Sequence, residues 1–256
     1  MSETVPSIAL QLYSLRAELE EDFEGVVREV AAAGYAGVEP FGYPYRDAAA
    51  EGQLFRELGL QVPSFHAAIS AGEDTEKVIE AARIVGTRRI IVAGIGRGEA
   101  WDTRSKIEAN CALINESAAS AAAAGIELGY HNHWWEFDTV VDGQPVWRHM
   151  LNLLDEDVFF QIDTYWAQVG GADVVSVLSE LGTRNQVLHV KDGPADDPHS
   201  DMVAVGSGVM DWEAIFAVSD VDWVVVELDR CATDMLQAVR DSCTWLSGEG
   251  YARGSS

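Results

Sequence analysis

The sequence has little positive charge and very little lysine. Among its 256 residues, 17 are lysine or arginine and 42 are aspartate or glutamate, which gives a net charge of −25. The lysines are Lys77, Lys106 and Lys191. Nucleic acids and anionic membranes would repel so acidic a surface, so we expect neither as a partner. The excess of carboxylates favours a halophilic protein, and an ordinary acidic bacterial enzyme is the alternative.

Cysteine and long apolar runs are also scarce. Cys111, Cys231 and Cys243 are odd in number, far apart, and match no metal-binding spacing, which favours a reduced, cytoplasmic setting. No stretch reaches the roughly 20 apolar residues that a membrane helix needs. The start, MSETVPSIAL, lacks the basic and apolar segments of a signal peptide.

Short β-like runs alternate with helix-like stretches along the whole chain, which predicts an α/β fold, a single (β/α)8 TIM barrel over residues 1–256. A frayed tail is expected from about residue 247. A doubly wound open sheet is the alternative, but no GxGxxG turn follows the first strand, and AGIGRGEA (93–100) has the wrong spacing and is interpreted as a flexible loop. The expected strands are Ile8–Tyr13, Gly37–Pro40, Gln61–His66, Arg89–Ala93, Ile126–His131, Val158–Asp163, Val187–Val190 and Trp223–Leu228.

Four apolar runs in the second half of the chain end on acidic or imidazole side chains. Parallel strands bring their C-terminal ends to one barrel mouth, so these side chains are expected to converge there. Side chains alternate along a strand, and in each run the polar end shares a face directed into the barrel. The set is oxygen-rich with one imidazole, which suits a divalent metal such as Mn²⁺, Mg²⁺ or Co²⁺. Its members are Glu136, Asp163, His189 and Glu227.

Each of these residues also has a purely structural interpretation. Asp163 precedes Thr164 and could cap a helix. His189 could be a hydrogen-bonded histidine of the core. Glu227 follows four apolar residues and is harder to explain without function, because a buried carboxylate needs a partner.

The motifs YHNHWWEF, IDTYW, LHVKDG and VVELDR resemble the sugar phosphate isomerase/epimerase family of xylose isomerase-like TIM barrels. LQLYSLR, GVEPFGY, SFHA and VGSGVMDW extend the resemblance over nearly the whole chain. It implies a divalent metal held by Glu136, Asp163, His189 and Glu227. The chain departs from the family at Ser207, where an acidic residue is expected, and at the fifth strand, which ends in His-Asn-His. Glu136 is favoured as the first ligand, with His131 as the alternative.

Other residues are expected to contact substrate. His66 and Glu39 end the third and second strands, and Lys191 shares the inward face of its strand. Trp166 and Arg230 lie near the expected rim, which also carries the long non-periodic segment 192–211.

The resemblance implies an enzyme acting on a small carbohydrate through an enediolate, with Glu136 and Glu227 moving the proton. Isomerisation or epimerisation is favoured. The alternative is a lyase of the same family, a keto-inositol dehydratase or a 3-keto-glycoside cleaving enzyme, in which His131 or His133 protonates the leaving group. Endonuclease-type barrels need a basic surface and are excluded by charge. A non-catalytic sugar-binding barrel and a homo-oligomer are further options.

The charge imbalance makes a prediction about salt. Unscreened repulsion between carboxylates should destabilise the fold at low ionic strength, so the melting temperature should rise between low and multimolar KCl. An unchanged thermal melt across that range would reject the halophilic interpretation.

Overall fold

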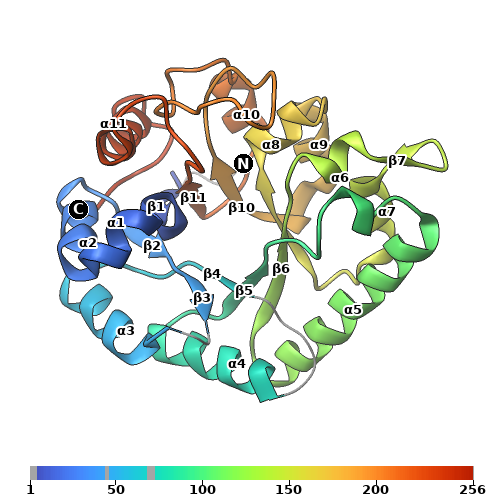
Figure 1. The fold of residues 1–256 in the computed structure, drawn as a ribbon, viewed down its shortest axis with the longest axis horizontal. Coiled ribbons are helices and arrows are strands. Elements are labelled where there is room, and N and C mark those ends of the chain that lie inside the picture. The colour runs from blue at the N-terminus through green and yellow to red at the C-terminus, as the bar shows by residue number, and fades with distance from the viewer. Residues whose placement is uncertain (1–4, 44–45, 68–72, 256) are drawn as a thin grey trace.

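The computed structural model describes residues 5–43, 46–67 and 73–255, and it shows a closed barrel of parallel strands (Figure 1). The hydrogen-bonded order of its strands is β2-β1-β11-β10-β9-β6-β5-β4-β3. The two ends of this order, β2 (Gly37–Glu39) and β3 (Phe41–Tyr43), are consecutive in the chain and separated only by Pro40. They are the two halves of one strand position. The sheet therefore closes with eight positions, as a TIM barrel does.

The remaining strands fall close to the expected ranges. The third expected strand, Gln61–His66, is the exception: Gln61 contributes one bridge to Gly37, and the chain becomes a strand only at Phe65. The other barrel strands are β1 (Ser7–Gln11), β4 (Phe65–Ala67), β5 (Arg89–Val92), β6 (Glu127–His131), β9 (Phe159–Asp163), β10 (Asn185–Val190) and β11 (Trp223–Val226).

Helices surround the barrel (Figure 1), and six of them begin at an aspartate whose side chain accepts a backbone N–H. Such caps satisfy the free amides of a first helical turn. The longest helices are α5 (Arg104–Ala123), α11 (Met235–Gly248) and α4 (Glu73–Val85). The others are α1 (Arg16–Glu21), α2 (Phe23–Ala32), α3 (Ala48–Glu57), α6 (Trp135–Asp138), α7 (Val146–Leu153), α8 (Thr164–Val169), α9 (Val174–Leu181) and α10 (Trp212–Val218), with short 3-10 turns η1 (Leu12–Leu15), η2 (Gly98–Ala100) and η3 (Gly182–Arg184).

A small hairpin, β7 (Val140–Val141) and β8 (Gln144–Pro145), was not expected from the sequence. None of the helices in the described parts of the chain combines the length and the apolar character needed to cross a bilayer.

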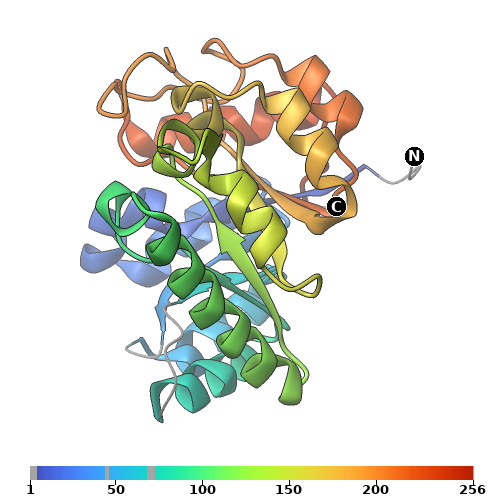
Figure 2. The same cartoon turned by 90° about the vertical axis from the view of Figure 1, so that its right-hand side faces the viewer.

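The C-terminal tail is not frayed, contrary to expectation. The Ile8 amide donates to the Arg253 carbonyl at 2.9 Å, and the Ser255 amide donates to the Gly34 carbonyl at 2.8 Å. Figure 2 shows the C-terminus beside the start of the chain, on the side of the barrel opposite the loops that follow the strands. The tail is therefore bound beside the start of β1, because its backbone finds partners there that its polar sequence does not indicate.

The barrel interior is layered as side-chain alternation requires. Its floor is an apolar cluster made of Ala9, Ile91, Phe159, Val187, Trp223 and Val225. Two residues further along the strands, the same inward face carries polar side chains, among them Gln161 and His189, both fully buried. The apolar floor thus supports a polar mouth.

Gly129 gives the floor its tight packing and makes a testable prediction. A Cβ there would lie 2.5 Å from the Phe159 ring and 2.8 Å from Ile91 Cδ1. We expect Gly129→Ala to lower the free energy of unfolding by about 1–3 kcal/mol, the usual cost of overpacking. Gly248→Ala, with nothing within 4 Å of the new Cβ, is the matched control and should be neutral or slightly stabilising. Equal stabilities of the two variants in urea titrations would contradict this account.

Candidate metal centre and active site

Four side chains converge at the C-terminal mouth of the barrel. His131 ends β6, Asp163 ends β9, His189 lies on β10 and Glu227 follows β11. All four are buried, and each offers one ligand atom within 4.8 Å of the others. Asp163 and His189 are paired in register on adjacent strands, so the parallel pairing itself brings them together.

Glu136 does not join this cluster. Its Oε1 accepts the Tyr130 hydroxyl at 2.6 Å, and its Oε2 accepts the His133 amide at 2.8 Å. Burial raises the pKa of the Glu136 carboxyl to about 7. Tyr130 alternates with the inward-facing His131, so Glu136 is held toward the outer layer of the barrel. The structure brings His131, the alternative ligand, to the mouth instead of Glu136.

The three residues of the His-Asn-His run lie in different environments. His131 joins the cluster. Asn132 extends the pairing with β9, because its Oδ1 accepts the Asp163 amide at 2.9 Å and its Nδ2 donates to the Asp163 carbonyl at 3.2 Å. His133 stacks on Trp135 with ring centroids 4.2 Å apart and lines the pocket. Burial lowers the pKa of the His133 imidazole to about 3.

Lys191 lies among three carboxylates. Its Nζ is 2.9 Å from Asp163 Oδ2, 2.7 Å from Glu227 Oε2 and 2.6 Å from Asp229 Oδ2. Burial opposes the ammonium charge, yet these three carboxylates hold the pKa of Lys191 well above its ordinary value. Lys191, which was expected to contact substrate, is therefore a buried cation that offsets part of the negative charge at the mouth. Its Nζ also lies 5.1 Å from the Trp166 ring centroid.

His189 links two glutamates. Its Nε2 is 2.6 Å from Glu39 Oε2, and its Nδ1 is 3.0 Å from Glu227 Oε2. Burial alone would lower the pKa of His189, but the charges and hydrogen bonds of Glu39 and Glu227 raise it to about 9. Glu39 is fully buried beneath the cluster, and although burial opposes its charge, His66 and His189 hold the pKa of its carboxyl well below the ordinary value.

Two amides complete the layer beneath the cluster. Gln11 Nε2 donates to Glu39 Oε2 at 2.8 Å, and Gln161 Nε2 donates to Glu39 Oε1 at 2.7 Å. The Gln161 carbonyl oxygen lies 2.7 Å from His66 Nε2. The Ser64 hydroxyl also donates to Glu39. The network fixes Glu39, which in turn fixes the ring of His189.

Asp163 has two functions at once. Its Oδ1 accepts the Trp166 amide at 2.8 Å and so caps α8, as its structural interpretation requires. Its Oδ2 faces Lys191 and lies 3.8 Å from His131 Nε2. Burial raises the pKa of this carboxyl to about 6. The cap orients the second oxygen toward the cluster, so the two interpretations are compatible.

The charges of the mouth suit a divalent cation. Glu39, Asp163, Glu227 and Asp229 carry four formal negative charges and Lys191 carries one positive charge, so with His189 neutral, as a metal ligand must be, the mouth carries −3. Imidazole and carboxylate donors together suit Mn²⁺, Co²⁺ or Zn²⁺. The residues of the mouth therefore fit such an ion in both charge and donor type.

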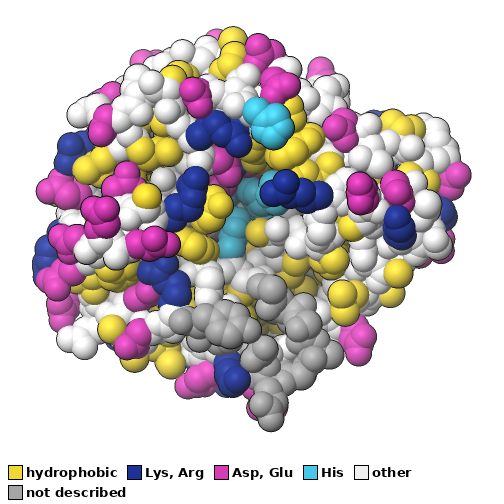
Figure 3. Space-filling model, viewed as in Figure 1, with side chains coloured by type: hydrophobic (Ala, Val, Ile, Leu, Met, Phe, Trp, Pro, Cys, Tyr) yellow, Lys and Arg dark blue, Asp and Glu magenta, His cyan; other side chains and the backbone are white. Residues whose placement is uncertain are grey.

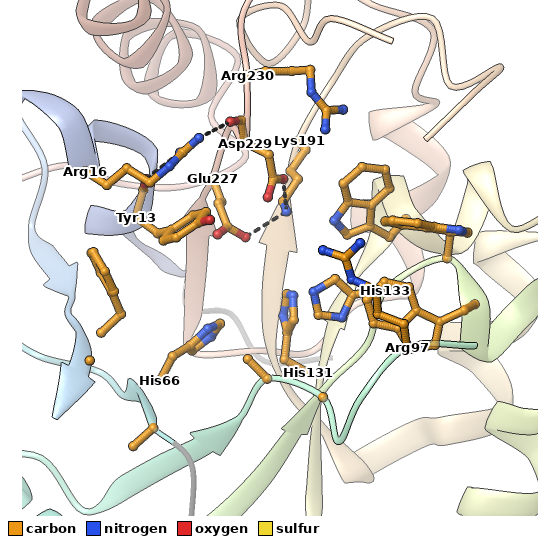
Figure 4. Close-up of a pocket in the computed structure, with 18 of the residues that line it drawn as sticks. Tyr13, Arg16, His66, Arg97, His131, His133, Lys191, Glu227, Asp229 and Arg230 are labelled. Carbon is orange, nitrogen blue, oxygen red and sulfur yellow. Dashed lines mark hydrogen bonds and ion pairs between the residues drawn. The ribbon is translucent and has the colours of Figure 1, made fainter. Parts of the chain in front are cut away.

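The cluster opens into a pocket of about 550 Å³ (Figures 3 and 4). Of the residues expected to contact substrate, His66, Lys191, Trp166 and Arg230 line it, whereas Glu39 lies below. The segment 192–211 follows β10, and Asp192 anchors it, because its Oδ2 accepts the Gly206 N–H at 2.9 Å and the Trp212 Nε1–H at 2.8 Å. Among the described residues, none of this segment lines the pocket, so its expected place on the rim stays a prediction.

Several pocket residues were not identified from the sequence, chiefly Tyr13, Arg16, Arg97 and Asp229. Asp229 could have been found, since it lies two residues after Glu227 and follows the same alternation. Arg97 lies in the glycine-rich stretch interpreted as a loop, and no periodicity indicates where a loop side chain points.

The buried Glu136 carboxyl predicts a pH dependence of stability. Its folded pKa of about 7 lies above its ordinary 4.5, so its stabilising contribution is complete below pH 4.5 and is lost as pH rises through 7. The Glu136→Gln variant should not lose stability in this way. As pH rises from 5 to 8, the free energy of unfolding of the variant should increase relative to that of wild type by up to ~3 kcal/mol. Glu20→Gln, at an exposed position, is the control. If the free energy of unfolding measured in urea changes equally with pH in Glu136→Gln and in wild type, the raised pKa of Glu136 is contradicted.

Comparisons with known proteins agree with the fold. Residues 27–247 match the family described as xylose isomerase-like TIM barrel. A sugar phosphate isomerase/epimerase structure from Parabacteroides distasonis superposes with a TM-score of 0.84 at 24% identity, covering 99% of this chain and 98% of the other. An L-ribulose 3-epimerase gives 0.71 at 16% identity, covering 96% and 94%. The IOLI protein, solved with a zinc atom, gives 0.70 at 13% identity, covering 96% and 98%. Curated protein sequences gave no match.

Proposed function

This chain belongs to the xylose isomerase-like TIM barrel family, and we propose that it is a divalent-metal-dependent isomerase or epimerase of a sugar. The observation that carries the proposal is the buried cluster of His131, Asp163, His189 and Glu227, of which His131 and Glu227 line the pocket. Catalytic residues in TIM barrels come from the ends of several strands, as these do. The sugar isomerase and epimerase structures that share the fold support the same reaction class.

The four clustered residues would hold the metal. When bound, a divalent cation would polarise a carbonyl and acidify the neighbouring C–H. The protein groups around it have separate tasks. Glu39 and the amide network orient His189, and Lys191 keeps Asp163 and Glu227 ionised.

Proton transfer is assigned to groups that line the pocket. Glu227 lines it, whereas Glu136 is held away by Tyr130 and His133 and is not proposed as its counterpart. Figure 4 shows His66, His131 and His133 on the wall facing Glu227 and Asp229. A proton removed by Glu227 from one face of the substrate would be returned from the histidine wall, with His66 as the donor.

The reaction class is tested by solvent deuterium exchange. A panel of ketoses, keto-inositols and 3-keto-glycosides is incubated with chelated protein and then with protein reloaded with Mn²⁺, Co²⁺, Mg²⁺ or Zn²⁺. We expect C–H exchange into at least one ketose, dependent on added metal. Absence of metal-dependent exchange across the whole panel would reject the proposal.

Four alanine variants and one control variant test the ligand set. His131→Ala, Asp163→Ala, His189→Ala and Glu227→Ala should each weaken metal binding by at least ~100-fold, beyond the usual cost of removing an outer partner. Glu136→Gln should retain the metal. Metal content after dialysis is the measurement, and far-UV circular dichroism checks folding. Metal loss in Glu136→Gln with retention in His131→Ala would restore Glu136 as the ligand.

A lyase is the second candidate, and the position of His133 favours it. This histidine lines the pocket, and within the described residues its buried Nδ1 has no hydrogen-bond partner, so it could face a leaving-group oxygen. In a lyase, His133→Asn should preserve C–H exchange while elimination falls by about 10² to 10⁴. Exchange and product release are measured on the same substrate, and equal decreases in both would remove His133 as a leaving-group acid.

A further inference from the structure

Three arginines at the pocket have no carboxylate partner within the described residues. They are Arg16, Arg97 and Arg230, all of which line the pocket. Acidic side chains far outnumber basic ones in this protein, and most arginines elsewhere form ion pairs with them. The paired ones include Arg28, Arg46, Arg83, Arg88, Arg89, Arg104, Arg148 and Arg240. Guanidinium groups left without a carboxylate at the pocket therefore stand out against the rest of the surface.

The three arginines differ in how many of their donors are used. Arg16 donates to the Tyr13 carbonyl at 2.9 Å and to the Asp229 carbonyl at 2.8 Å, and it stacks on Tyr13. Arg230 makes one hydrogen bond, to the Pro198 carbonyl at 2.6 Å. The side chain of Arg97 makes none with any described residue. A guanidinium has five N–H donors, so Arg97 and Arg230 keep most of theirs available.

Arg97 and Arg230 are also well placed for a ligand. Arg97 follows β5 and Arg230 follows β11, so both stand on the catalytic rim. Figure 4 shows their guanidinium groups turned toward the same part of the pocket, and Figure 3 shows basic side chains around the central hollow. Lys191 contributes little net charge there, because it is already paired with three carboxylates.

The pocket thus has a negative floor and a positive rim. The floor suits a cation, and the rim suits an anion, which guanidinium groups bind with charge-assisted hydrogen bonds. We propose that Arg97 and Arg230 form a subsite for an anionic group of the substrate, a carboxylate or a phosphate ester, at the end remote from the metal cluster. This inference rests on the proposed function for the carbohydrate part of the substrate, while the anion subsite is tested separately.

The test uses three ketoses that differ at one end: D-fructose, D-fructuronate and D-fructose 6-phosphate. Their affinities for the metal-reloaded full chain are measured by isothermal titration calorimetry at one fixed ionic strength, since salt screens exposed charges. An anionic ketose should bind at least about tenfold more tightly than fructose, the usual contribution of a charged hydrogen bond. Preference for the 6-phosphate indicates a phosphate ester, and preference for fructuronate indicates a carboxylate.

Variants assign the preference to the arginines. Arg97→Gln and Arg230→Gln should each reduce it, and in the double variant the anionic ketoses should bind no more tightly than fructose. Arg56→Gln is the matched control, because Arg56 also donates only to a backbone carbonyl, that of Ile84, far from the pocket. It should keep the full preference.

The outcomes separate the two proposals. Equal or weaker binding of the anionic ketoses, no detectable binding of any of the three, or a preference that survives the double variant would each overturn the anion subsite. The proposed function is judged by metal-dependent deuterium exchange instead. Exchange without an anion preference would overturn only the subsite, and an arginine-dependent preference without exchange into any ketose would overturn only the isomerase assignment.

Discussion

The mouth of this barrel depends on the mutual neutralisation of buried charges. Lys191 contacts Asp163, Glu227 and Asp229, and His189 contacts Glu39 and Glu227. Isolated charges in such a site would be expensive, and removing one partner leaves the others uncompensated. The contacts among Asp163, His189 and Glu227 depend on the parallel register of β9, β10 and β11, and Glu39 reaches His189 from β2. That register places Asp163 beside His189 and aligns His189 with Val225, two residues before Glu227. The geometry of the site is thus a direct product of the strand pairing.

The net charge of the chain does not measure the repulsion at its surface directly, because many of its carboxylates have specific partners. Asp22, Asp47, Asp173, Asp211 and Asp234 are helix caps whose side chains accept backbone amides. Such carboxylates stabilise helices near their positive N-terminal ends, which offsets part of the repulsion that their charges cause. Glu39, Asp163 and Glu227 are buried in the site and are compensated there by His189 and Lys191. The total charge therefore overstates the repulsion at the surface.

The fold and much of the site could be predicted from the sequence because alternation along buried strands is a local property. Alternation predicts directly that the side chains of Asp163, His189, Lys191 and Glu227 point into the barrel. Because the strands are parallel, their C-terminal ends were also expected to converge. Glu136 lies beyond the end of its strand, in a helical turn, where alternation no longer applies. Its direction depends on the Tyr130 hydroxyl, a partner from the outer layer. The docked tail and the side chain of Arg97 were missed for a similar reason, since contacts of loops and termini depend on the finished fold.

The negative charge at the metal cluster and the positive charge at the rim would together fix the orientation of a substrate in the pocket. An elongated sugar could bind a metal-bearing floor in several orientations, because its hydroxyl groups are alike. A second recognition point of opposite charge at the rim removes this ambiguity, since only one end of the substrate suits it. The carbon presented to Glu227 is then fixed by the distance between the two recognition points rather than by contacts at the reacting carbon. Binding energy from the remote anion is in this way used to orient the reacting end. The reaction outcome would depend on which face of that carbon the histidine wall opposes.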